Sequence, residues 1–563
     1  MTIKAESTSV SDHCLGECEQ HTRSAQNRLA LTLAIAGALH CMYPATTKAQ
    51  LFPAEIELGS LDGSNGFAIV GESTGDFSGI SVGGAGDLNG DGLDDLVVGA
   101  IYSDPSGVSN AGRSYVVFGA SNGFPPALGL FGLDGQAGIK INGEAENDFL
   151  GRSVHGAGDI NGDGSDDLIV GAIGSDVNGD FSGRSYVVYG DSNGLPASLD
   201  LVNLNGLNGF ALNGAVAGER SGRAVSSVGD INGDGIDDLA IGAYEADVNA
   251  VPGAGRVYVL FGSDSQLPNP VQLSDLNGLN GFILNGDSEE TRFGDAVSAA
   301  GDVNGDGIDD LILGAYFADV GSRTRAGRAY VIFGSDQGLP NPFNIATLDG
   351  SNGFVINGAA TEDYAGISVD AAGDVNADGI DDFIVGALGA SSLTHVDAGR
   401  SYVIFGSAQG LPHPFDLGDV NGLNGLILEG GSVAEFSGAS VSGLGDINGD
   451  GIDDLAIGAP IADPDGREDA GLAYVVFGSD SPLPSPLDLS NLNGSNGFAM
   501  SGRAAGDRFG GSVSNGGDVN GDGINDLIVG ARGVGTMFVP DNGTSYVIFG
   551  RGDRLFEDRF QSD

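Results

Sequence analysis

Residues 87–95 read Asp-Leu-Asn-Gly-Asp-Gly-Leu-Asp-Asp. Near-copies of this stretch begin at Asp159, Asp230, Asp302, Asp374, Asp446 and Asp518. Successive copies start 72, 71, 72, 72, 72 and 72 residues apart. Such a regular period is typical of one structural unit repeated along the chain. The sequence therefore predicts seven copies of one unit within a single large array.

Four short apolar segments precede or follow the acidic stretch in the first unit, at residues 66–71, 77–82, 96–100 and 114–119. They are rich in Val, Ile, Leu, Tyr and Phe, the composition of β-strands. Seven units of four strands favour a β-propeller, in which small sheets stack radially. We predict an all-β, seven-bladed propeller with four-stranded blades over residues 50–550.

The two ends of the repeat region complement each other. The chain enters through residues 66–71, a strand that in later units follows the Tyr-Val-Val-Phe-Gly strand, and it leaves through residues 545–550 with no such strand after it. Pairing the N-terminal strand with the last blade would close the ring and remove an exposed edge. An open solenoid is the alternative, and it would require capping units.

The acidic stretch has oxygen-bearing side chains at positions 1, 3, 5 and 9 and glycine at position 6. Calcium takes oxygen ligands at about 2.3–2.6 Å, and alternate positions of a tight loop can converge on one ion. In the first copy the predicted ligands are Asp87, Asn89, Asp91 and Asp95, with the backbone carbonyl of Leu93 as a fifth donor. In the other copies the predicted side-chain ligands are Asp159, Asn161, Asp163, Asp167, Asp230, Asn232, Asp234, Asp238, Asp302, Asn304, Asp306, Asp310, Asp374, Asn376, Asp378, Asp382, Asp446, Asn448, Asp450, Asp454, Asp518, Asn520, Asp522 and Asp526. The fifth donors are the backbone carbonyls of Ser165, Ile236, Ile308, Ile380, Ile452 and Ile524. Up to seven Ca²⁺ ions are therefore expected.

Differences between the copies avoid the predicted ligand positions. Ala377 replaces glycine at position 4 of the fifth copy, and Asn525 replaces aspartate at position 8 of the seventh. A metal-free Asp/Asn/Gly turn is the alternative for any single copy. Seven copies that keep every predicted side-chain ligand favour calcium, and magnesium fits less well because it demands stricter octahedral geometry.

Composition excludes several classes of function. The formal net charge of −54 argues against a nucleic-acid partner, because binding phosphates requires a basic surface. The three cysteines, Cys14, Cys18 and Cys41, all lie before residue 50. The rest of the chain therefore has no disulfides and no thiol chemistry.

Residues 1–49 differ from the repeat region. Arg23 and Arg28 precede the apolar run at residues 29–39, and small residues follow. This order is typical of a secretory signal peptide, and the run is shorter than the roughly 20 apolar residues that span a bilayer. We expect a signal peptide over residues 1–49, a secreted or cell-surface chain with no membrane span after cleavage, and a short tail at residues 551–563.

The repeat resembles the FG-GAP repeats of the N-terminal propeller of integrin α-subunits. Phe293-Gly294 and Phe509-Gly510 supply the FG pair, and Gly458-Ala459-Pro460 supplies the GAP triplet. The resemblance covers about residues 51–550. It implies a propeller with Ca²⁺-binding loops on one face and ligands approaching the opposite face. Nothing in the chain resembles the integrin leg domains, transmembrane helix or cytoplasmic tail.

The segments after the third apolar strand of each unit vary in length and composition. They are residues 102–110, 175–181, 244–254, 316–326, 388–398, 460–470 and 532–542. Uniform loops on one face and diverse loops on the other are typical of a scaffold that carries a recognition surface. Random drift of surface loops is the alternative. We expect a secreted calcium-binding propeller used in adhesion or in recognition of an extracellular protein or glycan.

Two other functions stay open, a hydrolase hosted by the propeller and a passive component of a surface layer or matrix. Residues 79–83 match the G-x-S-x-G pattern of a nucleophile elbow, but they fall within a predicted propeller strand. Only His155, His395 and His413 follow residue 49, and the chain has no H-E-x-x-H motif. We therefore predict no catalytic residues.

Overall fold

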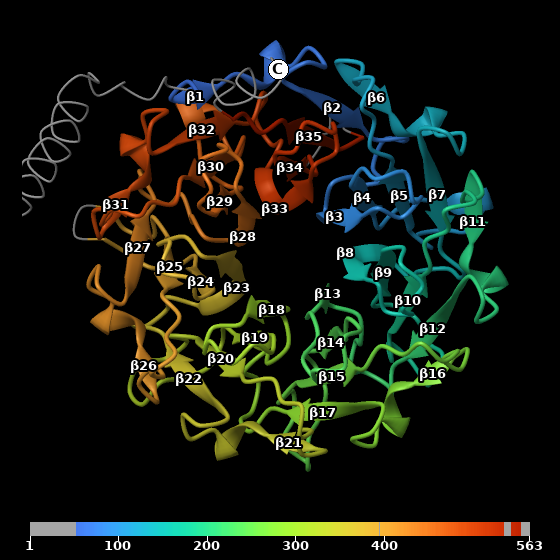
Figure 1. Cartoon of the computed structure of the whole chain (residues 1–563), viewed down its shortest axis with the longest axis horizontal. Coiled ribbons are helices and arrows are strands. Elements are labelled where there is room, and N and C mark those ends of the chain that lie inside the picture. Colours follow the sequence, from blue (N-terminus) through green and yellow to red (C-terminus); the bar gives the residue numbers. More distant parts are fainter. Residues whose placement is uncertain (1–51, 393–394, 534–541, 553–563) are drawn as a thin grey trace, which may run out of the picture. The chain divides into compact units, whose positions relative to one another are not determined.

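The computed structural model describes residues 52–392, 395–533 and 542–552. Within these ranges the chain forms seven five-stranded sheets arranged as a ring (Figure 1). The described residues contain no α-helix, only nine short 3₁₀ helices. The predicted signal peptide lies outside the described residues. The all-β, seven-bladed propeller predicted from the repeat is confirmed.

Each blade has four antiparallel strands and a short fifth strand at the outer edge. In the first blade, from the inside outward, these are β3 (Val82–Gly86), β4 (Asp95–Ala100), β5 (Arg113–Val117), β7 (Gly138–Asn142) and β11 (Ser198–Asp200). Strand β11 pairs in parallel with β7. It comes from the connection that follows β10 in the second blade, so every blade is completed by a segment of the next.

The other six blades have the same inside-to-outside order. The second has β8 (Leu150–Gly158), β9 (Asp167–Ala172), β10 (Arg184–Val188), β12 (Gly209–Asn213) and β16 (Val271–Gln272); the third has β13 (Val225–Ser227), β14 (Leu239–Ala243), β15 (Arg256–Leu260), β17 (Gly281–Asn285) and β21 (Phe343–Asn344); the fourth has β18 (Val297–Gly301), β19 (Asp310–Ala315), β20 (Arg328–Ile332), β22 (Gly353–Asn357) and β26 (Phe415–Asp416). The fifth has β23 (Ala365–Gly373), β24 (Asp382–Ala387), β25 (Arg400–Ile404), β27 (Gly425–Glu429) and β31 (Leu487–Asp488); the sixth has β28 (Ser440–Gly445), β29 (Asp454–Ala459), β30 (Leu472–Val476), β32 (Gly497–Ser501) and β1 (Glu55–Ile56); the seventh has β33 (Phe509–Gly517), β34 (Asp526–Ala531), β35 (Thr544–Ile548), β2 (Gly66–Val70) and β6 (Ala127–Gly129). The 3₁₀ helices are η1 (Leu58–Ser60), η2 (Pro105–Gly107), η3 (Leu130–Gly132), η4 (Leu201–Asn203), η5 (Leu273–Asp275), η6 (Ile345–Thr347), η7 (Leu417–Asp419), η8 (Pro464–Gly466) and η9 (Leu489–Asn491).

The N-terminal strand closes the ring as predicted. Strand β2 pairs antiparallel with β35, with Phe67 opposite Val547 and Ala68 opposite Tyr546. The innermost strands of neighbouring blades contact one another all the way round, including β33 of the last blade against β3 of the first. The structure adds a second closing strand, because β1 pairs in parallel with β32 of the sixth blade.

The second strand of the unit lies later in the sequence than predicted. Residues 77–82 were expected to form it, but β3 begins at Val82, because Phe77 and Gly79 have positive φ angles of 57° and 83° that break an extended chain. The glycine-rich stretch that follows forms the strand instead. A Cβ atom on Gly84 would lie 2.9 Å from the carbonyl oxygen of Asn515, so the crowded centre of the ring requires small residues.

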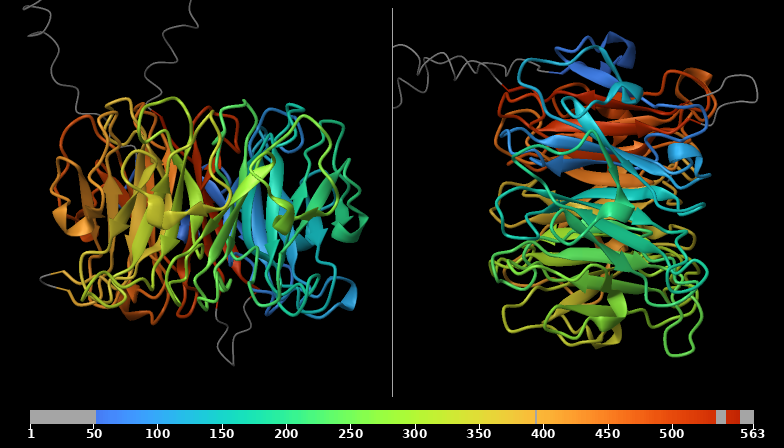
Figure 2. Two further views of the ribbon diagram at one scale, coloured as in Figure 1. Left: turned by 90° about the horizontal axis from the view of Figure 1, so that it is seen from below. Right: turned by 90° about the vertical axis from the view of Figure 1, so that its right-hand side faces the viewer.

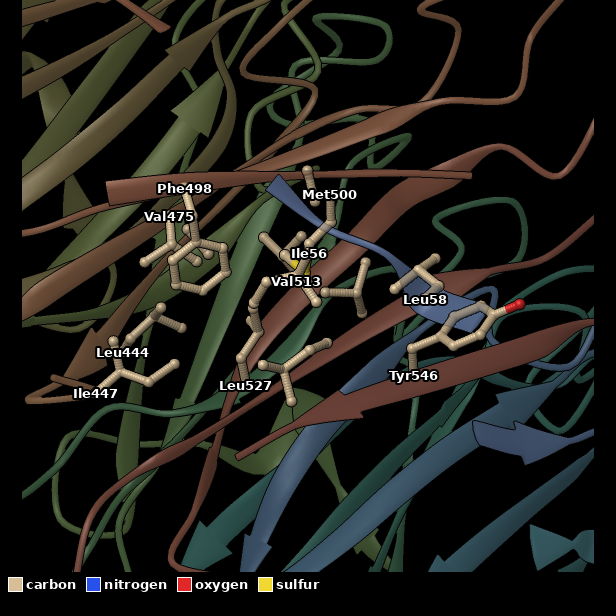
Figure 3. Packing of buried hydrophobic residues seen from close by; sticks show 14 of the residues in the cluster. Ile56, Leu58, Leu444, Ile447, Val475, Phe498, Met500, Val513, Leu527 and Tyr546 are labelled. Carbon is tan, nitrogen blue, oxygen red and sulfur yellow. The ribbon is translucent and has the colours of Figure 1, made fainter. Parts of the chain in front are cut away.

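The hydrophobic core lies between neighbouring blades. Ile56 and Leu58, from β1 and η1, pack with Leu444 and Val475 of the sixth blade and Leu527 of the seventh (Figure 3). Burying one such side chain contributes about 1.5–3 kcal/mol. The N-terminal segment therefore seals the junction between the last two blades by packing as well as by strand pairing.

Candidate functional site

The acidic loops occupy the predicted place in every blade. The first, Asp87–Asp95, connects the innermost strand β3 to β4, and Asp95 is the first residue of β4. Since neighbouring strands run antiparallel, all seven loops emerge on one face of the ring, here called the acidic-loop face. The connections between the second and third strands, which are the variable segments of the sequence, emerge on the opposite face, here called the variable face. Seen from the side, loops project from both faces (Figure 2).

Each acidic loop is folded around the carboxylate at its first position. In the first loop, Asp87 accepts hydrogen bonds from the backbone N–H groups of Asp91 at 3.0 Å and Gly92 at 2.8 Å. Asp91 accepts one from the N–H of Leu93 at 3.1 Å. These bonds bring positions 1, 5 and 7 of the predicted calcium site into one tight turn.

The carboxylate at position 9 is buried beneath the loop. Asp95 accepts hydrogen bonds from the N–H groups of Gly119 at 2.9 Å and Leu88 at 3.1 Å. Burial, helped by the negative charges of Asp91 and Asp87, raises the pKa of Asp95 to about 8. Burial likewise raises to about 8 the pKa values of Asp167, Asp238, Asp310, Asp382 and Asp526, and it raises that of Asp454 well above its usual range.

The donor set of each loop is chemically suited to calcium. All predicted side-chain ligands present oxygen, the donor that calcium prefers. A cation close to the buried carboxylate at position 9 would offset the free-energy cost of keeping that carboxylate ionised. In the described ranges, however, no three His, Cys, Asp or Glu side chains converge closely enough to hold a metal by themselves. Calcium binding by these loops therefore stays a prediction.

Position 8 of each loop has a role that the sequence did not reveal. Asp166 of the second blade accepts a hydrogen bond at 2.8 Å from the backbone N–H of Asp87 in the first blade. The same bond recurs between Asp237 and Asp159 (3.0 Å), Asp309 and Asp230 (2.9 Å), Asp381 and Asp302 (2.9 Å), Asp453 and Asp374 (2.8 Å), and Asp94 and Asp518 (2.7 Å). At the remaining junction Asn525 donates to the carbonyl oxygen of Leu444 at 3.0 Å. The loops thus fasten each blade to the next.

The serine of the G-x-S-x-G match, Ser81, has a structural role, as its position within a predicted propeller strand indicated. The Ser81 hydroxyl accepts a hydrogen bond at 3.2 Å from the N–H of Val154 in the next blade. Ser153 does the same for Val225 at 3.1 Å. A serine that recurs in this role around the ring is a fastening between blades.

A cavity of about 500 Å³ opens between the innermost strands near the acidic-loop face. Position-8 residues Asp94, Asp453 and Asn525 line it, together with His155 and Asp370 farther in. Burial raises the pKa of Asp370, whose carboxylate accepts a hydrogen bond from the Ser298 hydroxyl at 2.5 Å.

The variable face carries arginine and aromatic side chains on the second, third and fourth blades. We call these residues the arginine–aromatic row: Phe181, Arg220, Arg223, Tyr244, Glu245, Arg292, Phe317 and Arg325. They come from five different connections, so sequence inspection did not group them.

Contacts within the row alternate between stacking and ion pairing. The Arg220 guanidinium lies 4.8 Å from the ring centre of Phe181, and that of Arg292 lies 4.8 Å from the ring centre of Tyr244. Arg220 and Arg292 share one carboxylate, Glu245, at 2.7 and 3.0 Å. Two arginines on one glutamate leave the row with excess positive charge.

Comparison with protein families identifies the repeat. The FG-GAP repeat model matches seven times, at residues 78–117, 150–188, 221–260, 293–332, 365–404, 437–476 and 509–548. This chain is an FG-GAP repeat protein. Each match begins at the innermost strand or just before it and ends at the third strand, so the family unit coincides with three strands of a blade.

Similar proteins share only part of their length with this FG-GAP chain. Phosphatidylinositol-glycan-specific phospholipase D of Bos taurus is 32% identical over 36% of this chain and 23% of its own. Integrin alpha-5 of Xenopus laevis is 30% identical over 45% of this chain and 21% of its own. Integrin alpha pat-2 of Caenorhabditis elegans is 30% identical over 43% and 18%. The matched segments thus span less than a quarter of these proteins.

Solved structures that match are more remote. A structure of BBS1N in complex with ARL6DN has 11% identity and a TM-score of 0.41, covering 86% of this chain and 97% of that one. The V. cholerae biofilm matrix protein Bap1 has 12% identity and a TM-score of 0.25, covering 89% and 91%. The fold assignment therefore rests on the sheets and the family repeats. Among the helices of the described ranges, none is long and apolar enough to cross a membrane.

Proposed function

We propose that this FG-GAP protein is a secreted propeller that recognises an extracellular protein or glycan through its variable face, while Ca²⁺ in the acidic loops stiffens the ring. The observation that carries the proposal is the contrast between the two faces. The acidic loops repeat the same hydrogen bonds and take part in blade junctions, so they are poorly suited to distinguishing one ligand from another. The variable face concentrates aromatic and arginine side chains, the residue types that most often dominate binding energy at interfaces.

The test compares binding of the labelled full chain to cultured cells in Ca²⁺ and in chelator. Phe181→Ala removes an aromatic ring from the variable face, where the side chain is 41% exposed. Leu279→Ala is the control, because Leu279 is 91% exposed and lies two residues before Gly281, which pairs with Leu260 at the acidic-loop end of β15. We expect Phe181→Ala alone to weaken binding, and binding to be weaker in chelator. Equal effects of the two substitutions would refute recognition through the variable face.

A hydrolase is the second candidate. It is favoured by relatives named as phospholipases and by a cavity that holds the side chains of His155 and Asp370. His155 is the only histidine among the described residues that line the cavity, and its charge acts on the carboxylate of Asp370. Hydrolysis of lipid or ester substrates by the full chain, abolished by His155→Ala, would establish it and displace the binding proposal.

A further inference from the structure

The inner rim of the variable face carries arginines whose charge is incompletely neutralised. Arg152 and Arg223 occupy equivalent places on adjacent blades, each directly after the glycine at the second position of its repeat match, Gly151 and Gly222. The next blade has Asp295 at this place. Because β8 runs from Leu150 to the acidic loop at Gly158, Arg152 lies at the end of the strand that faces away from the acidic loops.

The only carboxylate of this group is already engaged. Asp295 is nearly buried, with 3% of its side chain exposed, and it binds Arg223 through two contacts, Nε to Oδ1 at 3.0 Å and Nη2 to Oδ2 at 3.2 Å. Arg152 makes no ion pair with any residue in the described ranges, and it is half-buried. Arg152 therefore lies near Arg223, and the carboxylate of Asp295 is already occupied by its two contacts with Arg223.

The electrostatic surroundings of Arg152 agree with this geometry. Burial and the positive charges of Arg223 and Arg532 lower the pKa of Arg152 to about 9, against the opposing effect of Asp295. Burial and the charge of Arg508 also lower the pKa of Arg532. The charges of two arginines therefore act on Arg152 and are opposed by that of one aspartate. An anion that binds beside Arg152 would offset the unfavourable burial of its charge and its repulsion by the neighbouring arginines, and this would favour binding.

The arginine–aromatic row continues outward from this rim. Tyr244 lies between two guanidinium groups, with Arg223 at 5.7 Å and Arg292 at 4.8 Å from its ring centre. Phe317 lies between Arg292 at 5.8 Å and Arg325 at 5.3 Å. Flat apolar rings therefore alternate with cations from one blade to the next, on a chain whose net charge is −54.

We propose that Arg152 and Arg223 bind the carboxylate or sulfate group of an acidic glycan, and that the arginine–aromatic row holds the following sugar units. This inference rests on the proposed recognition function and names the class of its ligand. The guanidinium fork matches the two oxygens of a carboxylate or sulfate, which makes arginine better suited to this role than lysine. A surface that repeats its charges and rings from blade to blade complements a polymer that repeats its own charges. The ring of Phe181, which is 41% exposed, offers apolar area that a sugar ring can cover and a free inorganic ion cannot.

Binding of the full chain to four probes tests the proposal by calorimetry. The probes are a sulfated heparin oligosaccharide, an oligogalacturonate, a neutral dextran oligosaccharide and a poly-glutamate peptide. We expect both acidic oligosaccharides, or one of them, to bind, dextran not to bind, and affinity to fall between ~20 and ~200 mM salt as screening increases. The two acidic oligosaccharides distinguish sulfate from carboxylate as the recognised group. Binding of poly-glutamate as tight as that of the acidic oligosaccharides would overturn the glycan assignment.

Substitutions locate the site. Arg152→Gln should weaken binding of the acidic oligosaccharide about tenfold or more, because a desolvated charge pair is lost. Arg467→Gln is the control, since Arg467 lies on the variable face of the sixth blade, forms an ion pair with the exposed Asp465 at 3.3 Å and donates to the Ser501 hydroxyl at 3.4 Å. The thermal midpoint of Arg152→Gln should equal or exceed that of the parent chain, because Arg152 forms no ion pair with another described residue and its charge is disfavoured where it lies. Equal affinities of the Arg152→Gln and Arg467→Gln variants would overturn the site.

The cell-binding assay separates this inference from the proposed function. If cells bind the protein through the variable face but Arg152→Gln and enzymatic removal of acidic glycans change nothing, the glycan inference fails and the recognition function stands. If Phe181→Ala and Leu279→Ala have equal effects on cell binding, the recognition function fails with it.

Discussion

The carboxylate of Asp166 reaches across a blade junction and accepts a hydrogen bond at 2.8 Å from the backbone N–H of Asp87. This bond joins the acidic loops of neighbouring blades. It also explains a glycine, because Gly86 has a φ of +65° and a Cβ atom there would lie 2.3 Å from the Asp166 carboxylate. The acidic loops therefore have a mechanical role in the ring that is independent of any metal.

Removing this bond should destabilise the ring. We expect Asp166→Ala to lower the free energy of unfolding by ~1–3 kcal/mol, because the Asp87 N–H loses its partner at a packed junction. Asp166→Asn should cost less, since an asparagine already occupies this position at the junction made by Asn525. Urea unfolding measures both values. Asp465→Ala is the control, because its ion pair is exposed and contributes about 0–1 kcal/mol. If the Asp166→Ala variant unfolds at the same urea concentration as the control variant, the hydrogen bond between Asp166 and Asp87 does not stabilise the ring.

The fold was predictable because its main determinants are repeated in the sequence. The period fixed the number of blades, and the unpaired apolar strands at residues 66–71 and 545–550 indicated closure, which the pairing of β2 with β35 confirms. The outermost strands were missed because strands such as β16 have two residues, too few to show an alternation of polar and apolar side chains. Strand β3 was misplaced because its glycines are required by close contacts with neighbouring blades, such as that of Gly84 with Asn515. The residues around β3 in the sequence do not reveal those contacts.

In the candidate sites, too, features within one continuous stretch were predictable and features assembled from different blades were not. The location of the seven acidic loops followed from the sequence, since each is a continuous stretch of nine residues. The role of position 8 did not, because its partner lies in another blade 79 residues away. The arginine–aromatic row escaped notice for the same reason. Arg220, Tyr244 and Arg292 belong to separate connections and meet only after the blades have assembled.

Position 4 of the acidic loops allows a test of backbone strain. Six copies have glycine there with positive φ, and Ala377 has φ of 60°. Gly162→Ala should cost ~1 kcal/mol, because an L-residue is strained at this φ while the nearest atom to its Cβ is 3.7 Å away. Gly90→Ala should cost more, because its Cβ would lie 2.5 Å from that of Ser192. Ala377→Gly should be close to neutral or mildly stabilising. Thermal unfolding of the three variants gives the order, and equal losses at Gly162 and Gly90 would contradict it.

Asp148 should contribute more to the stability of the ring in acid than at neutral pH. Burial raises the pKa of Asp148 to about 6, despite a hydrogen bond accepted from the N–H of Ala145. The folded state therefore binds a proton more tightly than the unfolded state, and this group's contribution to stability is present below pH ~4 and is lost as pH rises through about 6.

Replacing this carboxylate by its neutral isostere should remove that loss. We expect Asp148→Asn to match the parent chain near pH ~3.5 and to exceed it by about 1 kcal/mol above pH ~7, allowing for solvent screening. Asparagine keeps an oxygen that can accept from Ala145. Urea unfolding at both pH values measures the difference, with Asp134→Asn on an exposed turn as the control. A stability difference that does not change with pH would show that Asp148 does not titrate in this range.

Calcium should stabilise the ring through the acidic loops. At a free Ca²⁺ concentration about 100 times the dissociation constant, each occupied site adds ~2.7 kcal/mol, so even partial occupancy of seven loops should raise the thermal midpoint clearly. Chelator should lower the midpoint, and Mg²⁺ at equal ionic strength should restore less than Ca²⁺ does. Asp91→Ala removes one predicted ligand and one hydrogen bond, to the N–H of Leu93. It should reduce the number of Ca²⁺ ions counted by calorimetry by one, whereas Asp134→Ala should not. Equal midpoints in Ca²⁺, Mg²⁺ and chelator would mean that the hydrogen bonds of the loops hold the ring without metal.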